Sequence, residues 1–354
     1  MKKSSLFLGF LSTLSNIVIA LLIGSVLLLL KGENPLQVFY YLLVEPFTLG
    51  RGWIKVLSKT APYVFTGLSA ALAFRCGVFN IGIEGQMFWG ALAAAVTGIS
   101  LEGLPGPIHL PLALLAAMAA GGVWALIAGW LKVKLRVHEV LSTIMMNYLA
   151  GNIVAWLLIT YFRASGPQAK TPNVFPGARL PQFFPPDQLN AGLIIALLIA
   201  AGVFLLLRYL PLGWKIDSVG KNMVSTRFSG IDSGRTIMLV MFFSGMIAAL
   251  CGAERVLGAF GYMDLGFSAG YGFDGLSVAV IAANNPVAVV LVSLFFGLLN
   301  YGGVTLSMMT RVPPEWVNTL VAIMLILVAA RSSLFRSVQR WFRGRKEWIF
   351  RRRP

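Results

Sequence analysis

Long apolar runs alternate with short polar connections along almost the whole chain. A helix that spans the hydrocarbon core of a bilayer needs about 20 mostly apolar residues, and the chain offers ten apolar runs, several of them shorter than that. The run at residues 275–283 would cover only about half of the core, so it predicts a half-helix. The ten runs are residues 7–30, 56–74, 85–101, 110–131, 140–162, 189–210, 236–257, 275–283, 286–302 and 316–330. This pattern predicts an all-α, polytopic membrane protein with about ten transmembrane helices.

The composition excludes a water-soluble domain. Of the 354 residues, 57% are hydrophobic and only 12% are charged, and the mean hydropathy is +0.79, whereas about a quarter of the residues of a soluble domain carry charge. Collagen, coiled coils and intrinsic disorder are excluded because the 37 Gly and 17 Pro follow no repeat and apolar residues dominate everywhere except the tail. Cys76 and Cys251 lie in apolar stretches and indicate packing rather than a disulfide or a metal site.

The basic residues predict the orientation. The chain carries 29 Lys and Arg against 13 Asp and Glu, a net charge of +16, and nine of the basic residues follow Ala330. Because cytoplasmic connections are rich in Lys and Arg, both termini are predicted to be cytoplasmic. We therefore divide the chain into a transmembrane domain at residues 1–330 and a basic cytoplasmic tail at residues 331–354. We expect the tail to bind anionic membrane lipid and not nucleic acid.

The number of predicted spans permits an internal repeat. Five spans precede the long connection at residues 163–188 and five follow it. The two halves would then enter the membrane from opposite sides, as in an inverted repeat of two five-helix halves. This hypothesis rests on the count alone.

Polar residues interrupt the apolar sequence at residues 75–86, which read RCGVFNIGIEGQ. Irregular backbone at membrane depth is tolerated only where protein buries it or where it lines a watery cavity. Asn80, Glu84 and Gln86 could hydrogen-bond a polar solute there. The alternative is structural, with Glu84 capping the helix that follows it. Asn147, on a small-residue face of the fifth span, suits either a pore lining or a hydrogen bond between helices.

A second polar region lies between residues 254 and 301. Five aromatic residues, with Asp264 and Asp274, form an expected cluster on which a flat base could stack, although such residues also suit an interfacial belt. The aromatic residues are Phe260, Tyr262, Phe267, Tyr271 and Phe273. Asn284 and Asn285 before Pro286 predict a helix break, and Asn300 is expected to end the next span. Glu254 and Arg255 are ionisable groups inside a span and are functional candidates for that reason. The residues expected along a solute path are Asn80, Glu84, Gln86, Asn147, Phe273, Asp274, Asn284 and Asn300.

Three stretches resemble one transporter family. They are FNIGIEGQ at residues 79–86, the region of residues 219–258 with VGKN, RFSGI and FFSGMIAALCGAERVLG, and GYGFDGLSVAVIAANNP at residues 270–286. These stretches resemble the permease subunits of ABC importers that take up nucleosides, which are relatives of the ribose and branched-chain amino acid permeases. The resemblance extends over residues 61–330, and it is more specific for the permease family than for nucleosides.

The resemblance implies a permease subunit, not an enzyme, that moves a polar solute, first of all a nucleoside, into the cytoplasm by alternating access. It implies no catalytic residue, no metal and no cofactor on this chain. A separate cytoplasmic ABC ATPase would bind ATP with Mg²⁺, in agreement with the lack of a Gly-x4-Gly-Lys-Ser/Thr motif. The other partners would be a second permease subunit and an extracytoplasmic solute-binding protein, and the location a bacterial inner membrane.

Other transporters and a membrane-embedded enzyme are the alternatives to this function. An ABC permease for a simple sugar or an amino acid, or an ion-coupled secondary transporter, would share the same helices. A membrane-embedded enzyme would need a converging nucleophile or metal set, and the sequence offers none. The sequence fixes neither the nucleobase nor whether the permease pair is homomeric or heteromeric.

The resemblance also implies a short helix at residues 217–231 that docks on the ATPase. The expected docking residues are Gly220, Asn222, Ser225, Arg227 and Gly230. Val219, Met223, Val224 and Phe228 are expected to offer an apolar edge to the partner. Relatives commonly show Asn-Pro-Glu-Ala-Ala where this chain has Asn-Met-Val-Ser-Thr at residues 222–226. An ordinary basic loop is the alternative.

Overall fold

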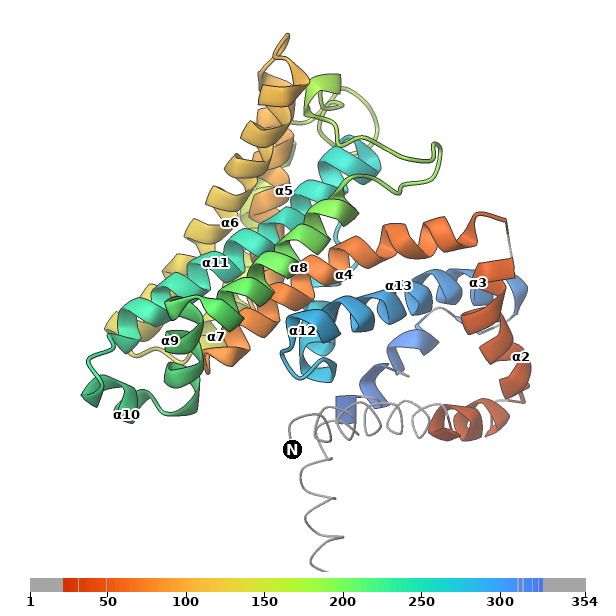
Figure 1. The fold of residues 1–354 in the computed structure, drawn as a ribbon. Helices are drawn as coiled ribbons and strands as arrows, with labels where there is room; N and C mark the ends of the chain where they lie inside the picture. The colour runs from red at the N-terminus through yellow and green to blue at the C-terminus, as the bar shows by residue number, and fades with distance from the viewer. Residues whose placement is uncertain are drawn as a thin grey trace, which may run out of the picture. The chain divides into compact units, whose positions relative to one another are not determined.

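A computed structural model describes residues 22–30, 32–48, 50–310, 312–313, 315–319, 321–323 and 325–326. Contacts divide the chain into two compact units, one of residues 42–305 and the other of residues 1–41 with 306–354. The described residues are helical, without a strand and with two isolated β-bridges (Figure 1). The all-α prediction is therefore confirmed for this part of the chain.

The smaller unit is described only in part. Residues 22–30 are helical, and α2 (Pro35–Phe39) begins where the side chain of Asn34 accepts a hydrogen bond from Leu36 N. A short π-helix, η1 (Tyr40–Val44), follows. Most of the first predicted span, residues 320, 324 and 327–330 of the tenth, and the whole basic tail at residues 331–354 lie outside the described residues.

Eight predicted spans, those between residues 56 and 302, each coincide with a helix of the larger unit. Five helices in the described part of the chain are long and apolar enough to cross a membrane, so the total of ten, the inverted repeat and the position of the termini stay predictions. The elements are α3 (Glu45–Thr48), α4 (Gly52–Arg75), α5 (Ile83–Ser100), α6 (Gly106–Leu135), α7 (Glu139–Tyr161), η2 (Pro176–Ala178), α8 (Gly192–Tyr209), α9 (Pro211–Lys221), α10 (Met223–Phe228), α11 (Ser233–Ala253), η3 (Glu254–Phe260), α12 (Tyr271–Ile281) and α13 (Pro286–Met309).

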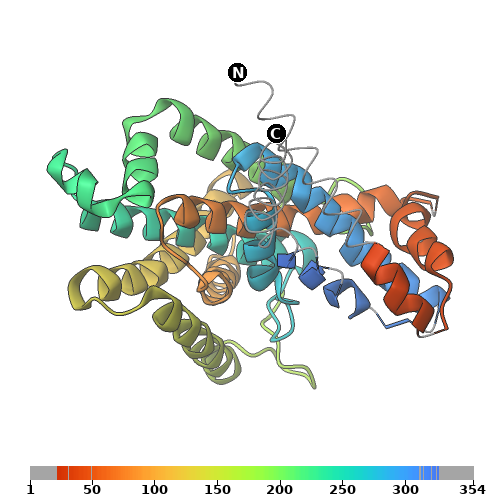
Figure 2. The same cartoon turned by 90° about the horizontal axis from the view of Figure 1, so that it is seen from below.

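Small residues bring the core helices of the larger unit together. α11 packs against α4, α5 and α6, and Figure 2 shows the same helices from below. A Cβ atom on Gly245 of α11 would overlap the backbone of Gly121 on α6, and one on Gly252 would overlap the backbone at Met87 on α5. Because there is no hydrophobic driving force for helices to associate in lipid, they usually pack through such close approach of their backbones.

α12 is a short helix that lies along one half of α4. A Cβ on Gly275 of α12 would overlap Thr66, and one on Gly67 would lie 2.7 Å from a methyl group of Val278. The 11 residues of α12 extend for about 16 Å, so the predicted half-helix is confirmed as a short helix.

α12 ends at Ile281, and the chain then turns back. Ala283 and Asn284 have positive φ angles of 50° and 57° in the turn, and α13 begins at Pro286. The predicted helix break is therefore confirmed. Asn300, which we expected at the end of a span, lies inside α13 instead, because this helix continues to Met309.

Candidate functional site

A polar cluster joins α4, α12 and α13. The hydroxyl of Tyr63 on α4 donates to Asp274 Oδ2 of α12 at 3.2 Å and accepts from Asn300 Nδ2 of α13 at 3.0 Å. The ring of Tyr63 meets the ring of Tyr271 edge to face, with centroids 5.1 Å apart. We call Tyr63, Tyr271, Asp274 and Asn300 the central cluster. Asp274 and Asn300 were expected from the sequence, but Tyr63 was missed because one tyrosine in an apolar run gives no signal.

Glu84 lies beside the central cluster and caps the first turn of α12. Its carboxylate accepts hydrogen bonds from Gly272 N at 2.8 Å and from the hydroxyl of Ser268. A carboxylate near the positive end of a helix is stabilising. The structural alternative from the sequence had Glu84 cap the helix that follows it. Glu84 does lie in the first turn of α5, but its carboxylate bonds to the first turn of α12, 188 residues away. A Cβ on Gly272 would overlap the Glu84 side chain, so only glycine fits there.

Asn80 and Gln86 hydrogen-bond to protein groups. Their side-chain amides pair with each other, at 3.0 Å and 2.9 Å, and Asn80 Nδ2 also donates to Ser244 Oγ of α11 at 2.8 Å. Asn80 Oδ1 accepts a further bond from Gly82 N. Both side chains are buried. This network joins the connection between α4 and α5 to α11.

Asn147 of α7 supports the same irregular segment. Its Oδ1 accepts from Gly85 N at 2.8 Å and its Nδ2 donates to Ile81 O at 2.9 Å. Thr143, one helical turn earlier, accepts from Ile81 N at 3.3 Å. Side chains of α7 thus satisfy backbone groups that would otherwise lie unpaired inside the helices, which is the requirement for irregular backbone at membrane depth.

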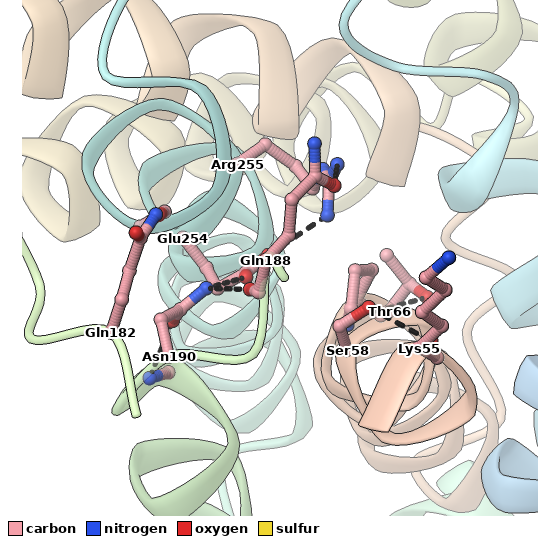
Figure 3. Close-up of polar contacts among 11 residues, drawn as sticks. Lys55, Ser58, Thr66, Gln182, Gln188, Asn190, Glu254 and Arg255 are labelled. Atoms are coloured by element: carbon pink, nitrogen blue, oxygen red, sulfur yellow. Dashed lines mark hydrogen bonds and ion pairs between the residues drawn. The ribbon is translucent and has the colours of Figure 1, made fainter. Parts of the chain in front are cut away.

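Glu254 and Arg255 form a second polar group with the loop that joins α7 to α8 (residues 162–191) (Figure 3). Glu254 Oε1 accepts from Asn190 Nδ2 at 2.7 Å, and Arg255 Nη2 donates to Gln188 Oε1 at 3.3 Å. Glu254 and Arg255 are each 1% exposed. The sequence identified both as functional candidates but not their loop partners, which lie more than 60 residues away. We call Gln188, Asn190, Glu254 and Arg255 the Arg255 cluster.

The loop also satisfies the carbonyl groups at the end of η3. Gln182 Nε2 donates to Gly258 O at 2.9 Å, Leu180 N to Leu257 O at 3.0 Å and Arg179 Nη2 to Phe260 O at 3.2 Å. The last carbonyls of a helix lack partners within the helix, so the loop holds this end of η3 in place.

The predicted aromatic cluster forms only in part: Phe260 and Tyr262 lie together, with ring centroids 6.1 Å apart, and the other rings have different partners. Tyr271 packs on Tyr63, Phe267 on Phe88 at 5.4 Å, and Tyr262 lies under the Lys170 ammonium at 4.5 Å. Phe273 is 50% exposed, and it does not join the central cluster. The rings lie on η3, on the loop at residues 261–270 and on α12. The packing of these segments decides which rings meet, and the sequence alone does not show it.

The segment predicted to dock on an ATPase forms two helices instead of one. Asn222 has extended backbone between α9 and α10, and its Oδ1 caps α10 by accepting from Val224 N and Ser225 N, both at 3.0 Å. Asparagine favours this position because its side chain replaces a missing backbone partner. Gly230, with φ of +75°, lies two residues beyond the end of α10. Arg227 belongs to α10, but its side chain lies outside the described residues.

α9 is held against the end of α4. Arg75 forms a bidentate ion pair with Asp217, with both N–O distances at 2.9 Å. A Cβ on Gly220 would overlap the carbonyl of Arg75. Val224 and Phe228 of α10 are 67% and 89% exposed, whereas Val219 of α9 is only 3% exposed. Val219 therefore packs inside the chain and was wrongly expected on the exposed edge.

No three His, Cys, Asp or Glu side chains of the described residues lie close enough together to hold a metal ion.

The structure is that of an integral membrane protein of the kind that includes transport permeases. It consists of apolar helices, one of them short and ended by a turn, with polar groups buried between them. Residues 52–329 match the family described as "Branched-chain amino acid transport system / permease component", and the chain belongs to this family.

Several characterised relatives are ABC transporter permeases. The chain is 37% identical over 282 residues to the guanosine ABC transporter permease protein NupP of Bacillus subtilis. This match covers 78% of this chain and 80% of that protein. It is 28% identical to the nucleoside ABC transporter permease protein NupB of Lactococcus lactis, over 89% of both chains. It is 29% identical to the glucose ABC transporter permease protein TsgB13 of Haloferax volcanii, over 88% of this chain and 85% of that protein.

Proposed function

We propose that this chain is the membrane permease subunit of an ABC importer that moves nucleosides into the cytoplasm across a bacterial inner membrane. The observation that carries the proposal is the 37% identity, over most of both chains, to a permease for guanosine. The similarity to a nucleoside permease supports it. Alternating access would then expose the solute path to one side of the membrane at a time.

The central cluster is the best candidate for the solute path. It lies at the amino-terminal end of a half-helix, where transporters commonly bind their substrates. Asp274 can accept hydrogen bonds from ribose hydroxyls, and Tyr63 and Asn300 can both donate and accept. Glu84 would position this end of α12.

The other expected path residues receive different roles in this proposal. Asn80, Gln86 and Asn147 hydrogen-bond within the protein, so we assign them to holding the helices together. Phe273 and Asn284 remain path candidates outside the central cluster.

The energy would come from a separate ABC ATPase that binds ATP with Mg²⁺. The exposed apolar side chains of α10 offer a docking edge, and the ion pair between Arg75 and Asp217 would transmit movement of α9 to α4. A second permease subunit would complete the path, and an extracytoplasmic binding protein would deliver the solute.

A sugar is the second candidate cargo, because one relative is a glucose permease and a carboxylate beside hydroxyl and amide groups also suits a polyol. A competition assay separates the two. Labelled guanosine uptake is measured in liposomes that contain the chain with its ATPase, binding protein and second permease, and unlabelled nucleosides, glucose or leucine are added. Nucleosides should compete and glucose should not. Competition by glucose alone would contradict nucleoside transport.

Substitution of Asp274 tests the path. D274N should lower guanosine uptake at least about tenfold, because the loss of one charged hydrogen bond has an effect of this size. E102Q is the matched control, since Glu102 is an exposed carboxylate in the turn between α5 and α6 and its substitution should leave uptake unchanged. Equal uptake by both variants would remove Asp274 from the path.

A further inference from the structure

Arg255 is an unusual buried arginine because most of its donors have no acceptor. A guanidinium carries five N–H groups and no acceptor atom. Nη2 donates to Gln188 Oε1 at 3.3 Å, and Nη1 lies 3.8 Å from Glu254 Oε2, too far for a hydrogen bond. Nε and Nη1 are buried without a hydrogen-bond partner among the described residues. Buried charged donors are costly to leave unpaired, so this arrangement favours a ligand that supplies acceptors.

The surroundings of Arg255 indicate what such a ligand looks like. The guanidinium carbon lies 4.6 Å from the ring centre of Phe260 and 5.6 Å from that of Tyr271. Tyr271 belongs to the central cluster, so Arg255 lies next to the proposed solute path. The aromatic neighbours suit a flat ring that stacks, and the free N–H groups suit acceptor atoms on the edge of that ring.

Arg255 can become accessible without breaking a strong bond. Its single hydrogen bond to the α7–α8 loop, to Gln188, is long, and the ion pair with Glu254 is also long. Glu254 itself stays bonded to Asn190 when Arg255 turns away. Figure 3 shows the Arg255 side chain reaching from η3 toward Gln188, with α4 facing it. Loss of the Gln188 bond alone would therefore leave the guanidinium able to donate to a solute.

We propose that Arg255 selects the base of the transported nucleoside by donating to an exocyclic carbonyl. The inference rests on the proposed function and deepens it. An arginine cannot accept a hydrogen bond, so it binds a carbonyl oxygen and repels an amino group at the same ring position. The permease then prefers inosine and guanosine over adenosine, and uridine over cytidine.

Equilibrium binding to the purified permease–ATPase complex, without the binding protein, tests this selection. Labelled inosine is competed with unlabelled inosine or adenosine, which differ by a carbonyl or an amino group at position 6. Inosine should compete about tenfold better or more, which is the effect of one charged hydrogen bond. Uridine and cytidine serve as a second pair. Equal competition within both pairs would overturn the inference. This test uses only the unsubstituted complex.

Two variants then assign the selection to Arg255. R255Q should bring the inosine to adenosine ratio close to one, because an amide can donate to a carbonyl and accept from an amino group. Q182L is the matched control: it removes a hydrogen bond from the same loop to η3 without touching Arg255, and it should keep the ratio of the unsubstituted complex. A ratio that R255Q leaves unchanged, or that Q182L alters as strongly, would overturn the role of Arg255.

Failure of the proposed function gives a different result. If the unsubstituted complex binds no nucleoside and the complete system takes none up, nucleoside transport and the selection by Arg255 are both overturned. If nucleosides bind and are taken up but R255Q does not change the ratio, only the inference about Arg255 fails.

Discussion

Individual buried polar residues join the helices of this protein through hydrogen bonds to one another. Asn80 uses its carbonyl oxygen and its amide group in bonds to Gly82, Gln86 and Ser244. The sequence predicted that the polar residues of the segment at residues 75–86 do not face lipid, and the burial of Asn80 and Gln86 confirms this. It did not predict their partners, because Ser244 is 164 residues away and only the packing of α11 brings it close.

Replacement of Asn80 by leucine should destabilise the protein by about 2 to 4 kcal/mol. Leucine has a similar volume but makes no hydrogen bonds, so several buried polar groups would lose their partners. The matched control is N152L. Asn152 is an exposed asparagine of α7 whose amide donates to Tyr148 O of the same helix, and its loss should cost less than about 0.5 kcal/mol. Thermal unfolding of the purified variants in detergent measures both. A similar loss of Tm in the two variants would contradict the role of Asn80.

Helices are the elements that the sequence predicts best. Eight apolar runs coincide with helices because length and hydropathy alone define them. The ends and breaks of helices are harder to predict from the sequence, because side-chain contacts determine where they fall. α9 and α10 separate at Asn222, a residue that caps α10. α13 continues past Asn300 through Gly302, where a Cβ would overlap the backbone of Leu42. Capping of α12 by Glu84 depends on packing between distant segments.

The exposed edge of α10 is expected to bind the ATPase. F228D places a charge on a side chain that is 89% exposed, so the permease itself should stay stable while binding of the ATPase falls at least about tenfold, because an apolar anchor is lost and a charge is buried. S229D adds the same charge on the next exposed residue and is the control. Co-purification of the ATPase measures the effect. If F228D retains the ATPase as well as S229D does, the docking edge lies elsewhere.

The distribution of charges predicts the orientation of the whole molecule in the membrane. Basic residues gather in the connections that we place in the cytoplasm and in the tail. With this orientation, the α7–α8 loop would face outward and α10 would face the cytoplasm. The carboxyl-terminal tail at residues 331–354, the main source of the prediction, lies outside the described residues, so orientation rests on charge and not on packing.

Cysteine labelling tests this orientation. Cys76 and Cys251 are buried and should react little with a membrane-impermeant maleimide. Q168C, in the α7–α8 loop, should be labelled in intact cells, whereas S229C should react only after the membrane is opened. Labelling of S229C, and not of Q168C, in intact cells would reverse the topology.

The most direct test of the account is whether ATP drives solute movement through this chain. The purified chain, its second permease subunit, the ATPase and the binding protein are reconstituted in liposomes. Uptake of labelled guanosine is measured with ATP and no ion gradient, and with a proton or sodium gradient and no ATP. We expect uptake only with ATP and only when the ATPase is present. Uptake that an ion gradient drives in the absence of ATP would contradict the account and identify a secondary transporter.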